Sequence, residues 1–120
     1  MNFKTAPLLL LSLACLASAA CISSGDQTTV NDLFTSGGAG TIVQLCTNTV
    51  LTVSAPIEFT ANNQEISTEG YPTDDTRATI QPASGTSVTT MITGYGFNEI
   101  RILNIQLDGL RPTLGFVEGT

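Results

Sequence analysis

The chain has 120 residues, with four basic and ten acidic side chains, no histidine and a formal net charge of −6. A chain of this length has room for one small domain. Its acidity predicts repulsion from phosphate-rich surfaces, so we expect no nucleic-acid partner and no binding to anionic membranes. The absence of histidine removes the commonest general base and any Ser-His-Asp triad.

Residues 1–19 have the pattern of a secretory signal peptide. Lys4 precedes an apolar run over residues 6–16, which is shorter than the roughly 20 residues that a membrane span needs. Small residues follow, as a signal cleavage site requires, and we expect cleavage after Ala19, with Ala20 as the alternative. The sequence therefore predicts a secreted, extracellular protein with no membrane segment after signal removal.

The mature chain, residues 20–120, keeps three arginines against ten carboxylates, a net charge of about −7. Cys15 leaves with the signal, so Cys21 and Cys46 remain as a pair in an oxidising compartment. Export predicts a disulfide between them, which would hold the mature N-terminus on the first strand. The alternative is a reactive or metal-binding thiol, but the chain has neither histidine nor a CxxC motif to support it.

One helix and several short strands are predicted along the mature chain. Asp26 or Thr28 can cap a helix that ends in the glycine-rich segment 37–40, and its apolar residues recur at helical spacing: Val30, Leu33 and Phe34. Beyond it, short β-branched segments separated by turn residues predict strands over 41–46, 50–53, 57–59, 78–81 and 89–93.

Residues 100–109 are the most informative segment. Apolar side chains alternate, but the phase slips by one residue at Asn104. Asparagine tolerates the left-handed conformation, so the slip predicts a sharp corner between two strands that both keep an apolar inward face. Repeated corners of this kind wind a chain into a solenoid.

The order of these parts resembles the N-terminal region of pectin-lyase-like (pectate lyase superfamily) right-handed parallel β-helix proteins of the secreted fungal type. The resemblance runs from Asp26 to Gly109 and rests on the segments 26–43, 54–59, 65–70 and 78–109. It implies an all-β fold: a right-handed parallel β-helix solenoid of few coils over 20–120, with a short N-terminal capping helix, and open or truncated at its C-terminus. We expect the following side chains to face inward: Val43, Leu45, Leu51, Val53, Ile57, Phe59, Ile66, Ile80, Ile92, Ile100, Ile102, Ile105 and Leu107.

Two groups of residues are candidates for chemistry. A glycoside hydrolase needs two carboxyl groups across a cleft, and a lyase of the pectate type would need a calcium site and a basic residue. Asp74, Asp75 and Arg77 are the first candidates for either activity, and the alternative is that they form a solvated turn. We assign no metal site, and calcium would be bound only if the lyase hypothesis holds. Tyr71 and Tyr95 follow glycines and are candidates for stacking on sugar rings, against the alternative that they pack over a coil edge.

These patterns favour a secreted, noncatalytic β-helix protein or a fragment of a longer cell-wall or polysaccharide-associated protein. The alternatives are a polysaccharide lyase or glycoside hydrolase acting on pectin-like polymers, and a carbohydrate-binding module. No cofactor is expected. The expected partners are polysaccharide or a second copy of the chain at the open C-terminal coil.

Overall fold

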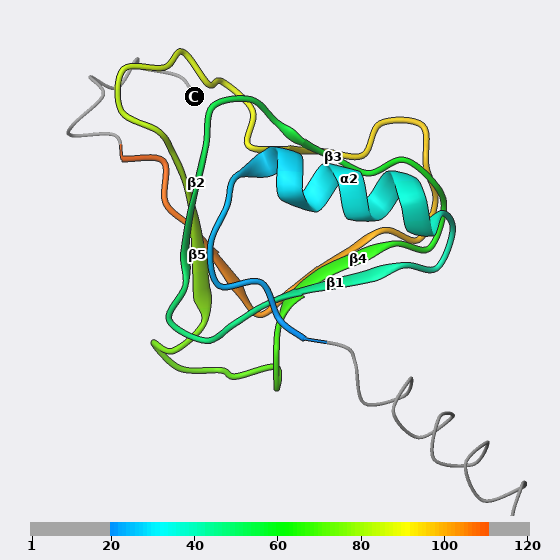
Figure 1. Ribbon diagram of the computed structural model, residues 1–120, viewed down its shortest axis with the longest axis horizontal. Coiled ribbons are helices and arrows are strands. Elements are labelled where there is room, and N and C mark those ends of the chain that lie inside the picture. The colour runs from blue at the N-terminus through cyan, green and yellow to red at the C-terminus, as the bar shows by residue number, and fades with distance from the viewer. Residues whose placement is uncertain (1–19, 111–120) are drawn as a thin grey trace, which may run out of the picture.

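The computed structural model describes residues 20–110, so the predicted signal peptide and residues 111–120 lie outside the described residues. Within that range one helix precedes short strands (Figure 1). The elements are α2 (Gln27–Gly37), β1 (Ile42–Leu45), β2 (Val50–Val53), β3 (Ile57–Glu58), β4 (Glu65–Thr68), β5 (Ala78–Pro82), β6 (Ile92–Thr93), β7 (Arg101–Leu103) and β8 (Ile105–Leu107).

The strands form three sheets in the orders β1–β4–β7, β2–β5–β8 and β3–β6, and every pairing is parallel. Each of the strands β1 to β5 therefore pairs with the strand three places later in the chain. We call β1–β3 the first layer, β4–β6 the second layer and β7–β8 the third layer. The sheets lie on three sides of a common core (Figure 1). This confirms an all-β fold of parallel sheets with one short helix.

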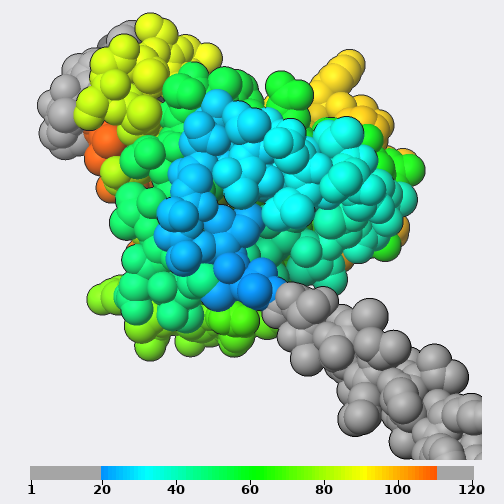
Figure 2. Space-filling model, viewed as in Figure 1, coloured from blue at the N-terminus to red at the C-terminus, as the bar shows by residue number. Residues whose placement is uncertain are grey.

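The helix α2 begins and ends as the sequence predicts. The Asp26 side chain accepts a hydrogen bond from the Thr28 backbone N–H at 2.9 Å, and the Gly38 N–H donates to the Phe34 carbonyl at 3.0 Å. Gly38 has a φ of 74°, which glycine adopts without steric cost. Val30 and Phe34 are fully buried, whereas Leu33 is exposed. In the space-filling view the helix covers the near end of the first layer (Figure 2).

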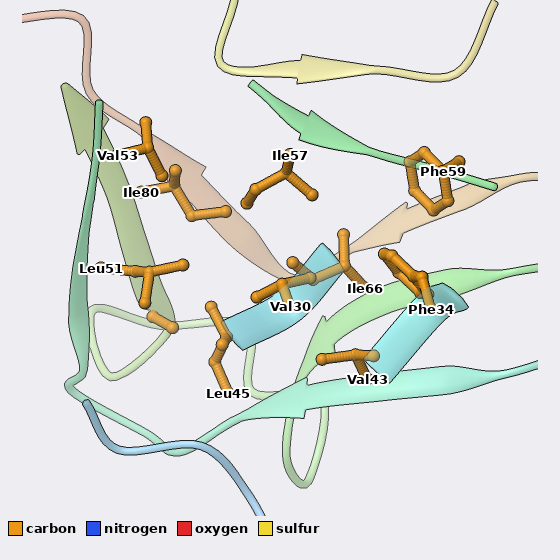
Figure 3. Packing of buried hydrophobic residues seen from close by; sticks show 11 residues of the cluster. Val30, Phe34, Val43, Leu45, Leu51, Val53, Ile57, Phe59, Ile66 and Ile80 are labelled. Atoms are coloured by element: carbon orange, nitrogen blue, oxygen red, sulfur yellow. The ribbon is translucent and has the colours of Figure 1, made fainter. Parts of the chain in front are cut away.

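The core gathers the apolar side chains of α2 and the first two layers (Figure 3). The rings of Phe34 and Phe59 lie 5.0 Å apart, so the helix packs directly on the third sheet. The predicted inward residues that are buried are Val43, Leu45, Leu51, Val53, Ile57, Phe59, Ile66 and Ile80, and those partly buried against this core are Ile92, Ile100 and Ile105.

Two predicted core residues are exposed instead. Ile102 and Leu107 are in register with the fully buried Ile66 and Ile80, but 42% and 51% of their surfaces are accessible. Both belong to the third layer. The inward orientation follows from the register, and the burial is missing because, among residues 20–110, no further strand lies over them.

The predicted corner at Asn104 is confirmed. Asn104 has a φ of 54° and separates β7 from β8. Its carbonyl accepts from the Thr68 hydroxyl at 2.6 Å, and its amide Nδ2 donates to the Pro72 carbonyl at 2.9 Å. Hydrogen bonds therefore join the corner between β7 and β8 to the corner that follows β4 in the second layer.

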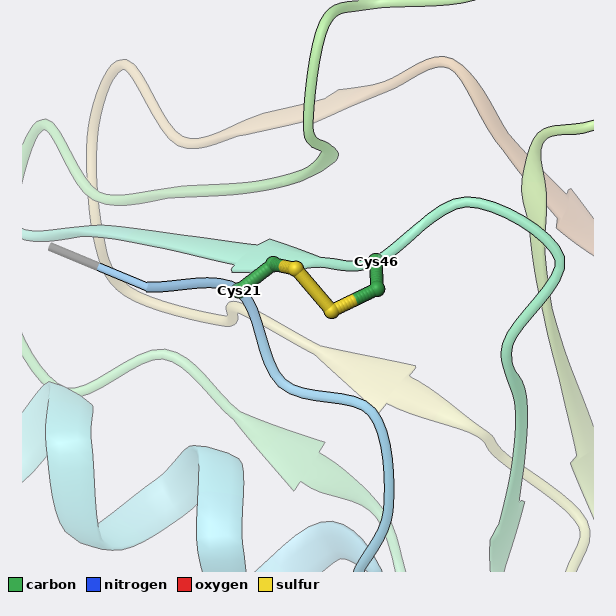
Figure 4. Close-up of a disulfide and its surroundings, with 2 residues drawn as sticks. All are labelled: Cys21 and Cys46. Carbon is green, nitrogen blue, oxygen red and sulfur yellow. A yellow bond between two sulfur atoms is a disulfide. The ribbon is translucent and has the colours of Figure 1, made fainter.

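The predicted disulfide is also confirmed, and it joins Cys21 to Cys46 with their Cα atoms 4.9 Å apart (Figure 4). Ile22 lies beside β1, because its N–H donates to the Gln44 carbonyl and its carbonyl accepts from the Cys46 N–H, both at 2.9 Å. The chain entering α2 is thus fixed covalently and by hydrogen bonds to the edge of the first sheet.

Candidate functional site

The structure places Asp74, Asp75 and Arg77 in the exposed connection between β4 and β5. The Asp74 carboxylate accepts from both the hydroxyl and the backbone N–H of Thr76, and these two bonds lower its pKa. The Arg77 guanidinium donates to the Asp74 backbone carbonyl at 2.9 Å. Asp74 and Arg77 therefore stabilise a turn, which is the alternative that the sequence left open for them.

The two candidate tyrosines lie in different connections. Tyr71 follows β4, whereas Tyr95 lies between β6 and β7 and has 96% of its surface exposed. The Tyr71 ring is partly exposed, but its hydroxyl donates to Oε2 of Glu65 at 2.8 Å. Tyr71 thus belongs to a polar cluster on the outer face of the β1–β4–β7 sheet, and Tyr95 stands at a separate turn.

This polar cluster, which we call the Glu65 cluster, was not found from the sequence. It comprises Gln44 on β1, Asn63 before β4, Glu65 and Ser67 on β4, Tyr71 after β4, and Arg101 on β7. Glu65 and Ser67 point away from the core because they alternate with the core residue Ile66, and adjacent parallel strands place Arg101 beside Glu65.

Hydrogen bonds connect every member of the cluster. Oε2 of Glu65 accepts from the Ser67 hydroxyl at 2.7 Å, and Oε1 accepts from Nε of Arg101 at 3.0 Å in an ion pair. Ser67 in turn accepts from Nε2 of Gln44 at 3.2 Å. Arg101 also donates through Nη1 to the Asn63 side chain at 2.6 Å. The side chains hold one another in a fixed arrangement that spans all three strands.

The charge of Glu65 is stabilised despite its burial. Only 5% of its side chain is accessible, and this burial by itself raises the pKa of the carboxyl. Hydrogen bonds from Ser67, Tyr71 and Arg101, together with the charge of Arg101, lower the pKa by a larger amount. The net result is a pKa below the ordinary value, so Glu65 is ionised at neutral pH. Its partner Arg101 is 35% accessible and presents the polar edge of the cluster to solvent.

An open hollow of about 230 Å³ adjoins the cluster on the first sheet. It is lined by Ala20, Ile42, Gln44 and Glu69. Gln44 is shared between the hollow and the Glu65 cluster, so the same sheet face offers a shallow depression, an apolar side chain and a set of fixed polar groups. Such a face can bind an extended polar ligand.

The described residues contain no group of three or more histidine, cysteine, aspartate or glutamate side chains placed to hold a metal ion. Over residues 20–110, no helix is both long and apolar enough to cross a membrane. Comparison with known proteins finds no matching family model, no matching curated protein and no matching solved structure.

Proposed function

We propose that this protein is a secreted, noncatalytic parallel β-helix solenoid that binds neutral polysaccharide on the outer face of its β1–β4–β7 sheet. The uniformly parallel pairing, with strands recurring in threes, supports the solenoid, as does the predicted resemblance to pectin-lyase-like proteins. The disulfide is compatible with export, because such bonds persist in oxidising compartments.

The Glu65 cluster is the observation that carries this proposal. The partly exposed groups of the cluster are the Arg101 guanidinium and the Gln44 amide, with which sugar hydroxyls can form hydrogen bonds, and the buried Glu65 and Ser67 hold them in place. Side chains ordered before binding lose little conformational entropy when a ligand arrives. The partly exposed ring of Tyr71 adds an amphipathic surface on which a sugar ring can stack.

The electrostatics of the cluster favour binding over hydrolysis. Glycoside hydrolysis requires one carboxyl group held in its protonated form, with a raised pKa. The pKa of Glu65 is lowered instead, and both of its oxygens accept hydrogen bonds within the protein. The net charge of about −7 on the mature chain favours a neutral polymer over an anionic one such as polygalacturonate.

The test is binding of the mature chain to insoluble glucan, chitin and polygalacturonate, with each supernatant assayed for released sugars. We expect retention on a neutral polymer, little retention on polygalacturonate and no released product. Tyr71→Ala should reduce retention at least tenfold, and Tyr71→Phe, which keeps the ring, should reduce it less. Tyr95→Ala is the matched control and should bind like the wild type.

Two results would contradict the proposal. The first is failure of the folded protein to bind any of the three polymers. The second is release of sugars that stops when Asp74 or Asp75 is replaced by alanine, since this would restore the hydrolase or lyase hypothesis at the β4–β5 connection.

A further inference from the structure

The connection between β5 and β6 is rich in hydroxyl side chains and carries no charge. We call residues 84–90 the hydroxyl segment, and five of its seven residues have a hydroxyl group: Ser84, Thr86, Ser87, Thr89 and Thr90. No acidic or basic residue occurs from residue 78 to residue 98, although the chain as a whole is acidic. Segments rich in serine and threonine that also contain proline, here Pro82, are typical of O-glycosylated chains.

The fold presents the hydroxyl segment to solvent. It follows the end of β5 and projects beyond the sheets, and the space-filling view shows it as a protrusion (Figures 1 and 2). The exposed residues are Ser84, Ser87, Thr89 and Thr90. Val88 lies between them, is half-buried and packs against the core. This one apolar contact holds the segment on the protein while the hydroxyl groups on both sides of it stay accessible.

The exposed hydroxyls and the backbone beside them are not used by the fold. Within residues 20–110, these four side chains make no hydrogen bond, whereas the hydroxyl of Thr86 donates to the Ala83 carbonyl at 2.6 Å. The N–H groups of residues 87–90 make no backbone hydrogen bond to another described residue. An extended peptide is commonly bound through its main-chain groups. A modifying enzyme can therefore bind this stretch without breaking a strand.

We propose that the hydroxyl segment is a site of O-glycosylation, with Ser84, Ser87, Thr89 and Thr90 as the acceptors. The sugar donor is a glycosyl phosphate, either a sugar nucleotide or a lipid-linked sugar phosphate. The hydroxyl oxygen attacks the anomeric carbon, and a glycosidic C–O bond forms. The bond from the anomeric carbon to the phosphate oxygen breaks, the phosphate leaves with the electron pair, and the hydroxyl proton passes to a base of the transferase. This inference rests on the export that is part of the proposed function.

Sugars at this segment would not cover the Glu65 cluster. The cluster lies on the β1–β4–β7 sheet, whereas the segment connects strands of the other two sheets and projects at the corner between them (Figure 1). Attached sugars are bulky and hydrophilic. Exposed loop tips with small polar residues are preferred sites of proteolysis, so the sugars would shield the unbonded backbone of residues 87–90.

Two arginines flank the segment and make the test specific. Trypsin cleaves after Arg77 and Arg101, so the peptide 78–101 contains the whole hydroxyl segment. The full chain is secreted from a eukaryotic host, and its mass is measured intact and after digestion. We expect the intact mass to exceed that of the chain by whole sugar units, all carried by peptide 78–101 and released by mild alkali. The preceding peptide, which ends at Arg77, is the internal control: it has more serine and threonine residues and should keep the mass of its sequence.

Replacement of the four acceptors together by alanine should remove every added sugar unit. Because none of these hydroxyls bonds within the described fold, the circular dichroism spectrum should be unchanged. The matched control combines Thr35→Ala with Thr52→Ala, which remove exposed hydroxyls from α2 and β2, where the backbone is held in regular structure. This control should keep all the added mass.

Three results would overturn the inference. A secreted chain with the mass of its sequence means that the segment accepts no sugar, and the proposed binding function would be unaffected. Sugar units that persist in the four-alanine variant, or that lie on the peptide ending at Arg77, mean that the acceptors are elsewhere. Added mass that a phosphatase removes means that the hydroxyls accept phosphate instead. Conversely, sugar on peptide 78–101 of a protein that binds no polysaccharide would contradict the proposed function and support this inference.

Discussion

Gln64 connects the helix to the sheets, and its replacement should be among the most damaging single changes in the described fold. The side chain is fully buried. Its carbonyl accepts from the backbone N–H groups of Thr60 and Ala61, at 2.8 and 3.2 Å. Its Nε2 lies within hydrogen-bond distance of the carbonyls of Phe34 and Gly38, at 3.1 and 2.9 Å. One amide thus joins the C-terminus of α2 to the connection between β3 and β4.

The cost of removing it can be worked from these contacts. In Gln64→Leu, the carbonyl of Phe34 keeps the Gly38 N–H as a donor, and the carbonyl of Gly38 keeps the Thr41 hydroxyl. The two N–H groups bonded to the Gln64 carbonyl lose that acceptor. Both N–H groups lie in a partly buried turn, so at about 1 kcal/mol or slightly more for each lost hydrogen bond we expect Gln64→Leu to lower the free energy of unfolding by about 2–3 kcal/mol.

Gln64→Glu tests the hydrogen-bond donor of the Gln64 amide separately from its acceptor. It keeps an acceptor for the two N–H groups, but a carboxylate oxygen replaces the donor facing two carbonyls, and burial raises the pKa of such a group. A group whose pKa is raised on folding loses stability as pH rises, so this variant should be less stable at pH 7 than at about pH 5, relative to wild type.

The measurement is chemical denaturation followed by circular dichroism at both pH values. Gln106→Leu is the matched control: its side chain donates to the Arg77 carbonyl and the Thr79 hydroxyl in a partly buried site, and it should cost about 1 kcal/mol. If Gln64→Leu costs no more than Gln106→Leu, the account of α2 as anchored through this amide is wrong.

Three further predictions follow from other contacts. Burial raises the pKa of Glu65, but its hydrogen bonds and Arg101 lower it below the ordinary value of 4.5. The contribution of Glu65 to stability is therefore present above pH 4.5 and is lost as the pH falls through the lower pKa of the folded state. Arg101→Gln should cost about 2 kcal/mol at pH 7 and less near pH 3, as measured by denaturation at both pH values. Replacing Cys21 and Cys46 by serine should lower the unfolding free energy by about 3 kcal/mol through the 25-residue loop that they close, and an unchanged denaturation midpoint would contradict this. Asn104→Ala should cost about 2 kcal/mol, because it loses the hydrogen bond from Nδ2 and puts alanine in the left-handed region, which asparagine tolerates better. Asn104→Gly loses the same hydrogen bond without that strain and should cost about 1 kcal/mol; equal losses, measured by denaturation, would show that the backbone conformation is not the cause.

The elements predicted well from the sequence are those whose signals are local. Asp26 caps α2 and Gly38 follows its end because capping depends on residues within one turn. The corner at Asn104 was visible because a one-residue slip moves every following side chain to the other face of a strand. The disulfide was predicted from the expectation of export and from the two cysteines that remain after residues 1–19.

The Glu65 cluster could not be found this way, because its contacts cross the layers. Glu65 and Arg101 are 36 positions apart, and which residue lies beside Glu65 depends on the lengths of all the corners between β4 and β7. Successive layers differ in length: Ile42 pairs with Glu65, 23 positions later, whereas Glu65 pairs with Arg101, 36 positions later. A sequence without a fixed repeat length does not reveal such a register. The signal that could have indicated the cluster is a glutamate and a serine flanking a core isoleucine on one strand.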